Sequence, residues 1–216
     1  DYLDSNKKEF VKTVLPIIIN ENQNILMIRS FVNELKGKLE TFRTLNNNEI
    51  RKLNDIAQKY NIKYQNKHKL DLVDEILSNV DVIPNSIVLA QAAIESGWGK
   101  SRFAKEYNAL FGEYTYDDSE GVIPLERENG DTHLIKAFSS YSNSVESYFD
   151  NINSHYAYED FRDIRNIMRK RNNFSNVNLL VNKLSTYAED ENYIKTIRQV
   201  IKTNNFGIFD QKTISY

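Results

Sequence analysis

The sequence predicts a mainly α-helical protein with one small β-hairpin. Apolar residues recur every three or four positions through most of the 216 residues, which is the spacing of amphipathic helices. Five of the seven glycines fall instead between residues 97 and 130, together with Pro124. Glycine and proline at this density indicate turns and close backbone approach. Helices are therefore expected on both sides of one short, irregular segment.

Residues 7–80 read as helices, and residues 1–80 form a predicted N-terminal helical extension. Pro16 lies near the start of a long periodic segment, Asn48 caps the next helix, and a third helix follows. Exposing the apolar stripe of the first segment to water would be costly. We therefore expect residues 1–80 to pack on a core domain of residues 81–210, or to contact an envelope protein or a second copy of the chain. The stripe consists of Ile18, Ile25, Ile28, Val32, Leu35 and Leu39.

The segment from residue 85 to residue 95 is predicted to be a buried helix, because it is apolar on most faces and carries no charge before its last residue. That residue is Glu95, and Gly97 follows in the position that ends a helix in the left-handed conformation. Partial desolvation and the negative end of the helix dipole both favour a raised pKa for Glu95. A carboxylic acid that keeps its proton can act as the general acid of a glycosidase. The alternative is an exposed capping residue.

Two short strands are predicted at residues 122–127 and 132–138, joined by an Asn-Gly turn. Pro124 restricts the first strand to the edge of the sheet, because proline cannot donate a ladder hydrogen bond. After this hairpin, Asn143 and Glu146 have the spacing of a capping box. The helices that follow carry apolar stripes at residues 161–168, 177–184 and 193–201, and we expect these to form core.

Composition excludes several classes of function. A net charge of −2 disfavours electrostatic capture of nucleic acid, and the absence of cysteine excludes thiolate chemistry. The three histidines, His68, His133 and His155, have no metal-site spacing, so neither a metal nor a cofactor is expected. No apolar run is long enough to span a membrane. The chain starts at Asp1, and we expect a targeting segment to be absent from it.

Four ordered motifs resemble the bacterial glucosaminidases of the flagellar-autolysin type, glycoside hydrolase family 73. They span about residues 83–205, although the second has one extra residue between its Asn and its Leu-Phe-Gly. The N-terminal helices and residues 121–125 are more similar to the branch named after the bacterial Bax protein. The motifs are AQAAIESGWGKS at 90–101, YNALFG at 107–112, AFSSY at 137–141 and YAEDENY at 187–193.

This resemblance implies a lysozyme-like fold with Glu95 as the catalytic acid at a helix end and a β-hairpin as one wall of a sugar groove. It also implies an endo-β-N-acetylglucosaminidase, which hydrolyses the β-1,4 bond after N-acetylglucosamine in peptidoglycan. The expected partners are peptidoglycan glycan strands, and the expected location is the periplasm or cell envelope. A lytic transglycosylase is the nearest alternative enzyme, and a non-catalytic glycan-binding module is the alternative outside enzymes.

The resemblance places a second carboxylate on the hairpin, and Glu126 is the best positional match. The family has a Thr two residues before this acid and a Tyr after it, where this chain has Pro124 and Arg127. The substrate's own N-acetyl oxygen offers another route, which needs only a carboxylate to orient it. The alternative acids are Glu120, Glu128 and Asp131.

Four further residues are candidates for substrate binding. Trp98 and Tyr141 either present rings to sugars or fill the core beneath the groove. Tyr187 is expected in the groove on the resemblance, whereas Phe111 is expected in the core. Asn108 either binds substrate amides or fixes a turn of the backbone.

Overall fold

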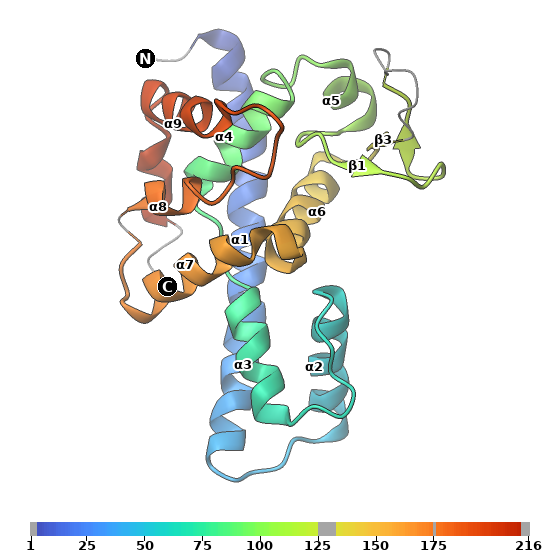
Figure 1. Cartoon of the computed structure of the whole chain (residues 1–216), viewed down its shortest axis with the longest axis vertical. Helices are drawn as coiled ribbons and strands as arrows, with labels where there is room; N and C mark the ends of the chain where they lie inside the picture. Colours follow the sequence, from blue (N-terminus) through green and yellow to red (C-terminus); the bar gives the residue numbers. More distant parts are fainter. Residues whose placement is uncertain (1–3, 125–132, 175, 213–216) are drawn as a thin grey trace. The chain divides into compact units, whose positions relative to one another are not determined.

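The computed structural model describes residues 4–124, 133–174 and 176–212, and this part of the chain is mainly α-helical with a small antiparallel sheet (Figure 1). It divides into two compact units. The first unit comprises the described residues within 1–21, 84–149 and 195–212, and the second those within 22–83 and 150–194. The expected domains at 1–80 and 81–210 rest on the sequence pattern and stay a prediction.

The described elements follow one another along the chain as labelled in Figure 1. They are α1 (Ser5–Glu40), α2 (Asn47–Lys59), α3 (Lys69–Asn79), α4 (Asn85–Glu95), α5 (Arg102–Tyr107), β1 (Tyr114–Thr115), β2 (Gly121–Val122), β3 (Leu134–Lys136), α6 (Tyr141–Ser154), η1 (Tyr156–Tyr158), α7 (Glu159–Lys170), α8 (Val177–Val181), α9 (Tyr193–Thr203) and η2 (Phe206–Lys212).

Helix α1 begins within two residues of the helical segment expected from residue 7, and well before its predicted apolar stripe. It starts at Ser5, so Pro16 lies inside the helix rather than near its start. The Asp4 carboxylate accepts the backbone N–H of Lys7 at 2.9 Å, which satisfies one of the free donors of the first turn. Val14 is fully buried and extends the apolar face toward the N-terminus. The residues of α1 up to Glu21 belong to the first unit, and those that follow belong to the second.

In the first unit, helix α4 is buried from Asn85 to Ala93, as its uncharged sequence predicts. Its N-terminus is held by η2. The Asp210 carboxylate accepts hydrogen bonds from the backbone N–H and the hydroxyl of Ser86, at 2.8 and 2.6 Å. The Asn85 amide donates to the carbonyl of Phe209 at 2.9 Å. These bonds satisfy the start of a helix that cannot reach water.

The sheet of the first unit has the strand order β1-β3-β2, and both pairings are antiparallel. The predicted pairing of β2 with β3 is confirmed, with Val122 opposite Ile135, and β2 is an edge strand as expected. Strand β2 ends at Val122, before Pro124. Strand β1 was not predicted, because two residues are too few to show a period. The expected Asn-Gly turn lies outside the described residues.

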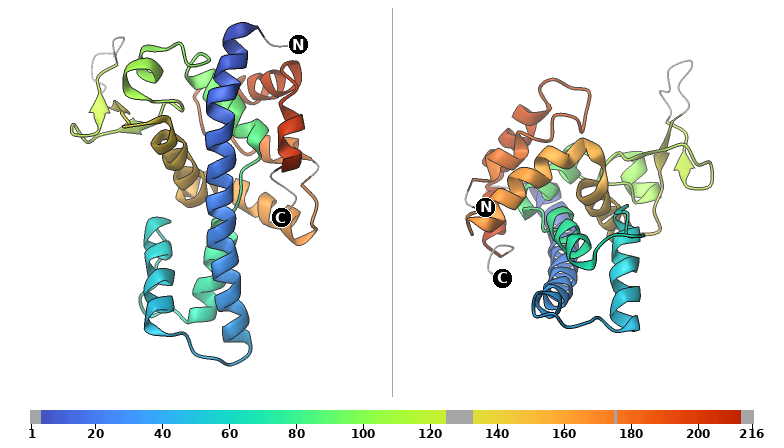
Figure 2. Two further views of the ribbon diagram at one scale, coloured as in Figure 1. Left: turned by 180° about the vertical axis from the view of Figure 1, so that it is seen from behind. Right: turned by 60° about the horizontal axis from the view of Figure 1, so that its bottom comes forward.

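In the second unit, α2 and α3 lie beside the C-terminal part of α1 (Figures 1 and 2). Helix α2 is capped by Asn46 rather than by the expected Asn48, because Asn46 and Glu49 form a complete capping box. Within the stripe of α1, Ile25, Val32 and Leu35 are fully buried. Contact with an envelope protein or a second copy stays a prediction.

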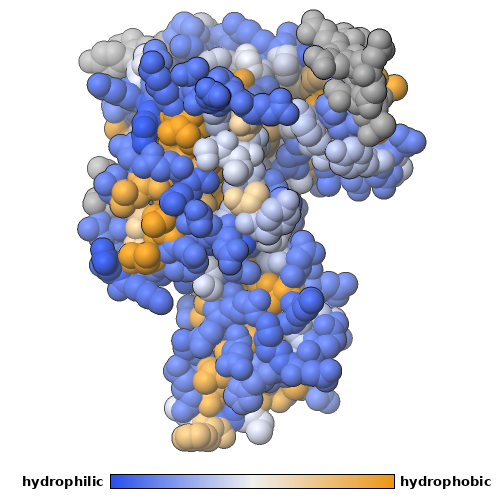
Figure 3. Space-filling view, in the orientation of Figure 1, coloured by the Kyte–Doolittle hydropathy of each residue, from blue (hydrophilic) through white to orange (hydrophobic). Residues whose placement is uncertain are grey.

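The surface on the face drawn in Figure 3 is mainly hydrophilic, with apolar residues in separate patches. Among the described residues, no helix combines the length and the apolar content needed to cross a bilayer.

Candidate active site

Glu95 is the last residue of α4, and the chain leaves the helix through a Schellman motif. Gly97 adopts a left-handed φ of 56°. The backbone N–H of Trp98 donates to the carbonyl of Ala93 at 2.8 Å, which is the bond that defines this motif. The predicted stop is therefore confirmed, and Glu95 is partly buried where the helix ends.

Trp98 also adopts a left-handed conformation, with φ 58°. This conformation is rare for a bulky residue and persists only where the surroundings impose it. The indole ring packs edge-to-face against Phe10 at 5.7 Å and Phe206 at 6.0 Å between ring centroids. The Lys7 ammonium lies 4.8 Å from the indole centroid. Trp98 thus has a packing role, and its role in substrate binding stays a prediction.

The backbone at Gly112 lies against the carboxylate of Glu95. A Cβ at this position would be 3.2 Å from the Glu95 Oε2 atom, and the φ of Gly112 is 63°. Both the close approach and the left-handed backbone favour glycine here. Phe111, the preceding residue, stacks on Tyr148 at 4.3 Å between centroids, and this confirms its expected place in the core. The second motif therefore forms a backbone wall beside the candidate acid.

Asn108 ends α5 in a left-handed conformation with φ 53°. Its side-chain amide donates to the carbonyl of Phe138 at 3.0 Å and so joins the second motif to the third. This geometry is that of a residue fixing a turn, which was one of its two expected roles. Tyr141, in the third motif, is the first residue of α6 and is partly buried. Substrate binding by Asn108 and Tyr141 stays a prediction.

Tyr187 belongs to the second unit, whereas Glu95 belongs to the first. Its ring is stacked on Tyr193 at 5.8 Å between centroids, with an interplanar angle of 5°. Tyr158 lies at 6.2 Å on the same ring. The fourth motif thus forms an aromatic cluster of its own, and the predicted contact of Tyr187 with sugar remains open to test.

The second carboxylate stays a prediction, since Glu126, Glu128 and Asp131 lie outside the described residues. Glu120 is described, exposed, and 3.5 Å from the Lys136 ammonium.

Glu113, which directly follows Gly112, was not among the site residues expected from the sequence. The Glu113 carboxylate accepts a hydrogen bond from the Ser147 hydroxyl at 2.6 Å. An acid immediately after the Leu-Phe-Gly motif was the available signal. Among the described residues, no cluster of three His, Asp or Glu side chains is placed to hold a metal ion.

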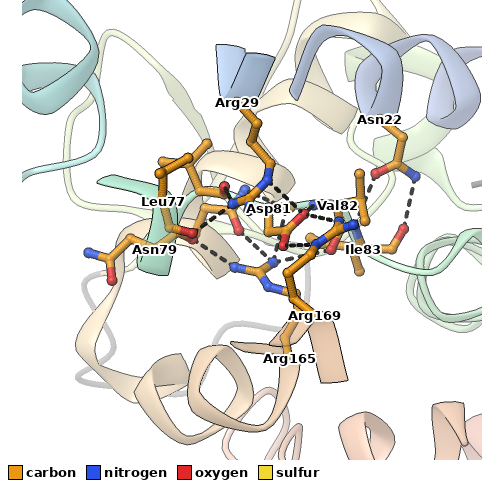
Figure 4. A network of polar contacts seen from close by, with 11 residues as sticks. Asn22, Arg29, Leu77, Asn79, Asp81, Val82, Ile83, Arg165 and Arg169 are labelled. Atoms are coloured by element: carbon orange, nitrogen blue, oxygen red, sulfur yellow. Dashed lines mark hydrogen bonds and ion pairs between the residues drawn. The ribbon is translucent and has the colours of Figure 1, made fainter. Parts of the chain in front are cut away.

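A second polar centre, also missed from the sequence, surrounds Asp81 in the second unit (Figure 4). The Asp81 side chain is fully buried, and its carboxylate accepts the Arg169 Nε–H at 2.9 Å. Arg29 approaches the same carboxylate to 3.4 Å. Arg165 donates to the backbone carbonyl of Asp81 at 3.0 Å. We name these four residues the Asp81 cluster.

The arginines of the Asp81 cluster also complete the C-terminal end of α3. Arg29 donates to the carbonyls of Leu77 and Val80 at 2.6 and 2.7 Å, and Arg165 donates to that of Asn79 at 2.7 Å. Cations are favourable at this end of a helix, where carbonyls lack partners. The cluster therefore holds α1, α3 and α7 together within one unit.

The electrostatics of the Asp81 cluster keep its members charged. Burial by itself raises the pKa of Asp81, but the hydrogen bond from Arg169 and the charges of Arg29, Arg165 and Arg169 outweigh it, so the pKa is lowered. Burial lowers the pKa of Arg165 to about 9, which leaves it protonated at neutral pH. Asp81 is thus a fixed carboxylate, not a proton donor at neutral pH.

Comparison with known proteins shows the family to which the chain is similar. The model of the glucosaminidase family, described as mannosyl-glycoprotein endo-beta-N-acetylglucosaminidase, matches residues 70–206. The chain is 32% identical to Bax of Escherichia coli (strain K12) over 184 residues, which make up 84% of this chain and 63% of Bax. It is 35% identical to the peptidoglycan hydrolase FlgJ of the same strain over 92 residues, which make up 38% of this chain and 29% of FlgJ. The chain thus spans less than two thirds of the length of either relative.

Among solved structures, the fold is similar to the catalytic domain of the autolysin Auto from Listeria monocytogenes, with a TM-score of 0.46 and 18% identity. That match covers 88% of this chain and 97% of the other.

The family model spans the helix that ends at Glu95, the Gly112 wall, the sheet and the aromatic cluster of Tyr187. This region is more than half of the chain, and the identity to Bax extends beyond it. The chain belongs to the glucosaminidase family, glycoside hydrolase family 73, in its Bax-like branch.

Proposed function

We propose that this chain hydrolyses the β-1,4 glycosidic bond after N-acetylglucosamine in peptidoglycan, with Glu95 as the general acid. The observation that carries the proposal is the position of Glu95, which ends a buried helix with its carboxylate against the backbone of Gly112. Family membership and the similarity to FlgJ, a protein named as a peptidoglycan hydrolase, support the substrate class.

The proposed chemistry begins with transfer of the Glu95 proton to the departing sugar oxygen, as the glycosidic bond breaks and positive charge develops on the sugar ring. The Gly112 wall limits the rotamers of Glu95 and so favours a fixed direction of proton transfer.

Completion of the reaction requires a nucleophile on the opposite face of the sugar. Glu126 is our candidate, acting on water or attacking directly, and the substrate's N-acetyl oxygen is the alternative. The Glu126→Gln variant separates these routes. If Glu126 activates water or attacks, turnover falls about as far as in Glu95→Gln, whereas attack by the N-acetyl oxygen gives a smaller loss. Unchanged turnover would move the role to Glu120, Glu128 or Asp131, or remove the need for a second acid.

Trp98, Asn108, Tyr141 and Tyr187 are the proposed substrate-binding residues, and peptidoglycan glycan strands are the proposed partner. This substrate implies a periplasmic or cell-envelope location. Aromatic rings suit sugar faces because they bury apolar area without demanding hydrogen bonds.

Mass spectrometry of muropeptides released from purified sacculi tests the proposal. Reducing N-acetylglucosamine ends are expected. Anhydro-muramic ends would instead identify a lytic transglycosylase, and binding to sacculi without release would identify a glycan-binding module.

Two variants accompany this experiment. Glu95→Gln keeps the volume of the side chain but cannot donate the acid proton, and should release products at least about a hundredfold more slowly. Glu106→Gln is the matched control, because Glu106 is an exposed glutamate on α5 and undergoes the same replacement of a carboxyl group by an amide. Equal rates for the two variants would refute the assignment of Glu95.

A further inference from the structure

The second unit contains a pocket of about 430 Å³ formed by residues of α1, α3 and α7. We call it the basic pocket. The Asp81 cluster contributes two of its members to the wall, and the remainder are polar or basic with one leucine. The lining residues are Arg29, Lys36, Asp74, Leu77, Ser78, Asn166, Arg169 and Lys170.

The basic pocket carries more positive than negative charge. Its lining includes four cationic side chains and one carboxylate, that of Asp74. Asp81 lies behind the wall, where its buried carboxylate is shared by Arg29 and Arg169. Counting the two groups behind the wall as well, Asp81 and its third partner Arg165, an excess of three positive charges remains around the pocket. Glu40 lies 3.9 Å from Lys36, outside the lining, and reduces this excess to two.

Several donors of the basic pocket remain available for a ligand. Lys170 is exposed and has no ion-pair partner among the residues that the structure describes. The Arg169 side chain is 27% exposed and uses only part of its five-donor fork on Asp81. The Ser78 hydroxyl accepts the Asn166 amide at 2.8 Å, and its own proton can be donated to an anion.

We propose that the basic pocket binds a phosphate dianion, either inorganic phosphate or the terminal phosphate of a monoester. A dianion matches the excess of two charges, whereas a carboxylate neutralises one. The oxygens of phosphate match an arginine fork together with separate lysine and hydroxyl donors. The proposal concerns the second unit and does not depend on the proposed glycosidase activity.

Isothermal titration of the whole chain with inorganic phosphate tests the site. Sodium chloride should hold the ionic strength near 0.15 M, where charges more than about 8 Å apart are largely screened. Lys170→Gln should weaken phosphate binding about fivefold to tenfold, because one charge-assisted hydrogen bond is lost at a partly screened position. Arg171→Gln is the matched control. It removes the same charge from the next residue, which is exposed but does not line the pocket, and should change affinity less than about twofold.

A third variant should change affinity in the opposite direction. Asp74 accepts a hydrogen bond from the Lys36 ammonium at 2.7 Å, and it is the carboxylate in the lining. Asp74→Asn removes a repulsive charge and releases Lys36 toward the pocket, so phosphate binding should tighten about threefold or more. Asp74 is more than half exposed, so this variant should fold as the wild type does.

The outcomes separate a built site from general attraction of anions. Equal weakening by Lys170→Gln and Arg171→Gln, no tightening in Asp74→Asn, or no heat of binding with the wild type would each overturn the proposal. Titrations with methyl phosphate and dimethyl phosphate distinguish the source of the phosphate. Methyl phosphate binding like inorganic phosphate supports a monoester, loss of binding restricts the ligand to free phosphate, and stronger binding of the singly charged diester refutes the dianion.

Discussion

The surroundings of Glu95 in the first unit and of Asp81 in the second show two ways of placing a carboxylate inside a protein. Asp81 is fully buried among arginines from α1 and α7, with its pKa lowered. Glu95 is partly buried at the end of α4, beside residues in left-handed backbone conformations at Gly97, Trp98 and Gly112.

The two environments suit different roles for a carboxylate. Multiple charged hydrogen bonds fix Asp81 in one protonation state, and this favours stability over proton exchange. Left-handed backbone lies beside Glu95 instead, and the left-handed φ of Trp98, which is unfavourable for a bulky residue, is a kind of strain found at sites that do chemistry. We therefore expect substitutions at Asp81 to change folding and substitutions at Glu95 to change turnover.

The largest expected effect is that of Asp81→Asn. Removing the carboxylate leaves buried arginines uncompensated, so the free energy of unfolding should fall by about 3–5 kcal/mol. Urea denaturation followed by circular dichroism measures this change. Asp55→Asn, at an exposed position on α2, is the control and should stay within about 0.5 kcal/mol of the wild type. Similar stabilities for the two variants would show that the cluster does not hold the unit together.

Glu95→Gln should show the opposite pattern. Turnover should fall at least about a hundredfold, equivalent to about 2.7 kcal/mol of transition-state stabilisation, since the amide donates no acid proton. The free energy of unfolding should change by no more than about 0.5 kcal/mol, because the amide preserves the shape of the side chain. Turnover and the free energy of unfolding should be measured on the same preparation. A large loss of stability with normal turnover per folded molecule would show that Glu95 serves folding and not catalysis.

Gly112→Ala should have an intermediate effect that links backbone to chemistry. A side chain at φ 63° costs about 1–2 kcal/mol, and its Cβ would press on the Glu95 carboxylate, so turnover should fall about tenfold. Gly37→Ala is the control, because Gly37 lies inside α1 with no atom near its Cβ position. That variant should gain about 0.5–1 kcal/mol in stability without a change in turnover. A Gly112→Ala enzyme with normal turnover would refute the wall beside Glu95.

The smallest expected effect is a pair of opposite pH dependences. The pKa of Asp81 is lowered, so its contribution to stability is present above about pH 4 and is lost as the pH falls through the folded-state pKa. Burial raises the pKa of Asp210, despite hydrogen bonds from Ser86, so ionisation of Asp210 lowers stability as the pH rises above about 4.

Melting temperatures of Asp81→Asn and Asp210→Asn relative to the wild type, measured between acidic and neutral pH, test these signs. The deficit of Asp81→Asn should shrink toward acidic pH. The melting temperature of Asp210→Asn relative to that of the wild type should be highest at neutral pH. Parallel pH profiles for the two variants would contradict the assignment of opposite shifts.

Local signals in the sequence predicted what depends on neighbouring residues. Helix α4 has its expected bounds because an uncharged segment, a glycine stop and a preceding Pro84 all lie within a few residues. Pairing of β2 with β3 was predicted because the two strands and the expected turn between them are also close together in the sequence. Helix α1 starts at Ser5, two residues before the helical segment expected from residue 7, although its predicted apolar stripe begins only at Ile18.

Long-range partners could not be predicted in this way. Asp81 is paired with Arg169, 88 residues later in the chain, and nothing local marks that partnership. A lone acid inside the run Val80-Asp81-Val82-Ile83 was the available signal, because an isolated buried charge requires compensation. The close approach of Gly112 to Glu95 was likewise not predicted from the sequence, although both residues lie in motifs of the same family.

The hydrogen bonds between η2 and the start of α4 bear on the order in which the protein matures. Ser86 and Asp210 are 124 residues apart, so the helix that ends at Glu95 gains its final N-terminal partner only after residue 210 has been synthesised. Contacts of such long sequence separation form late in folding. A growing chain would thus carry its candidate acid on an incompletely anchored helix, and the glycosidase activity that we propose for Glu95 would be delayed until synthesis has passed residue 210.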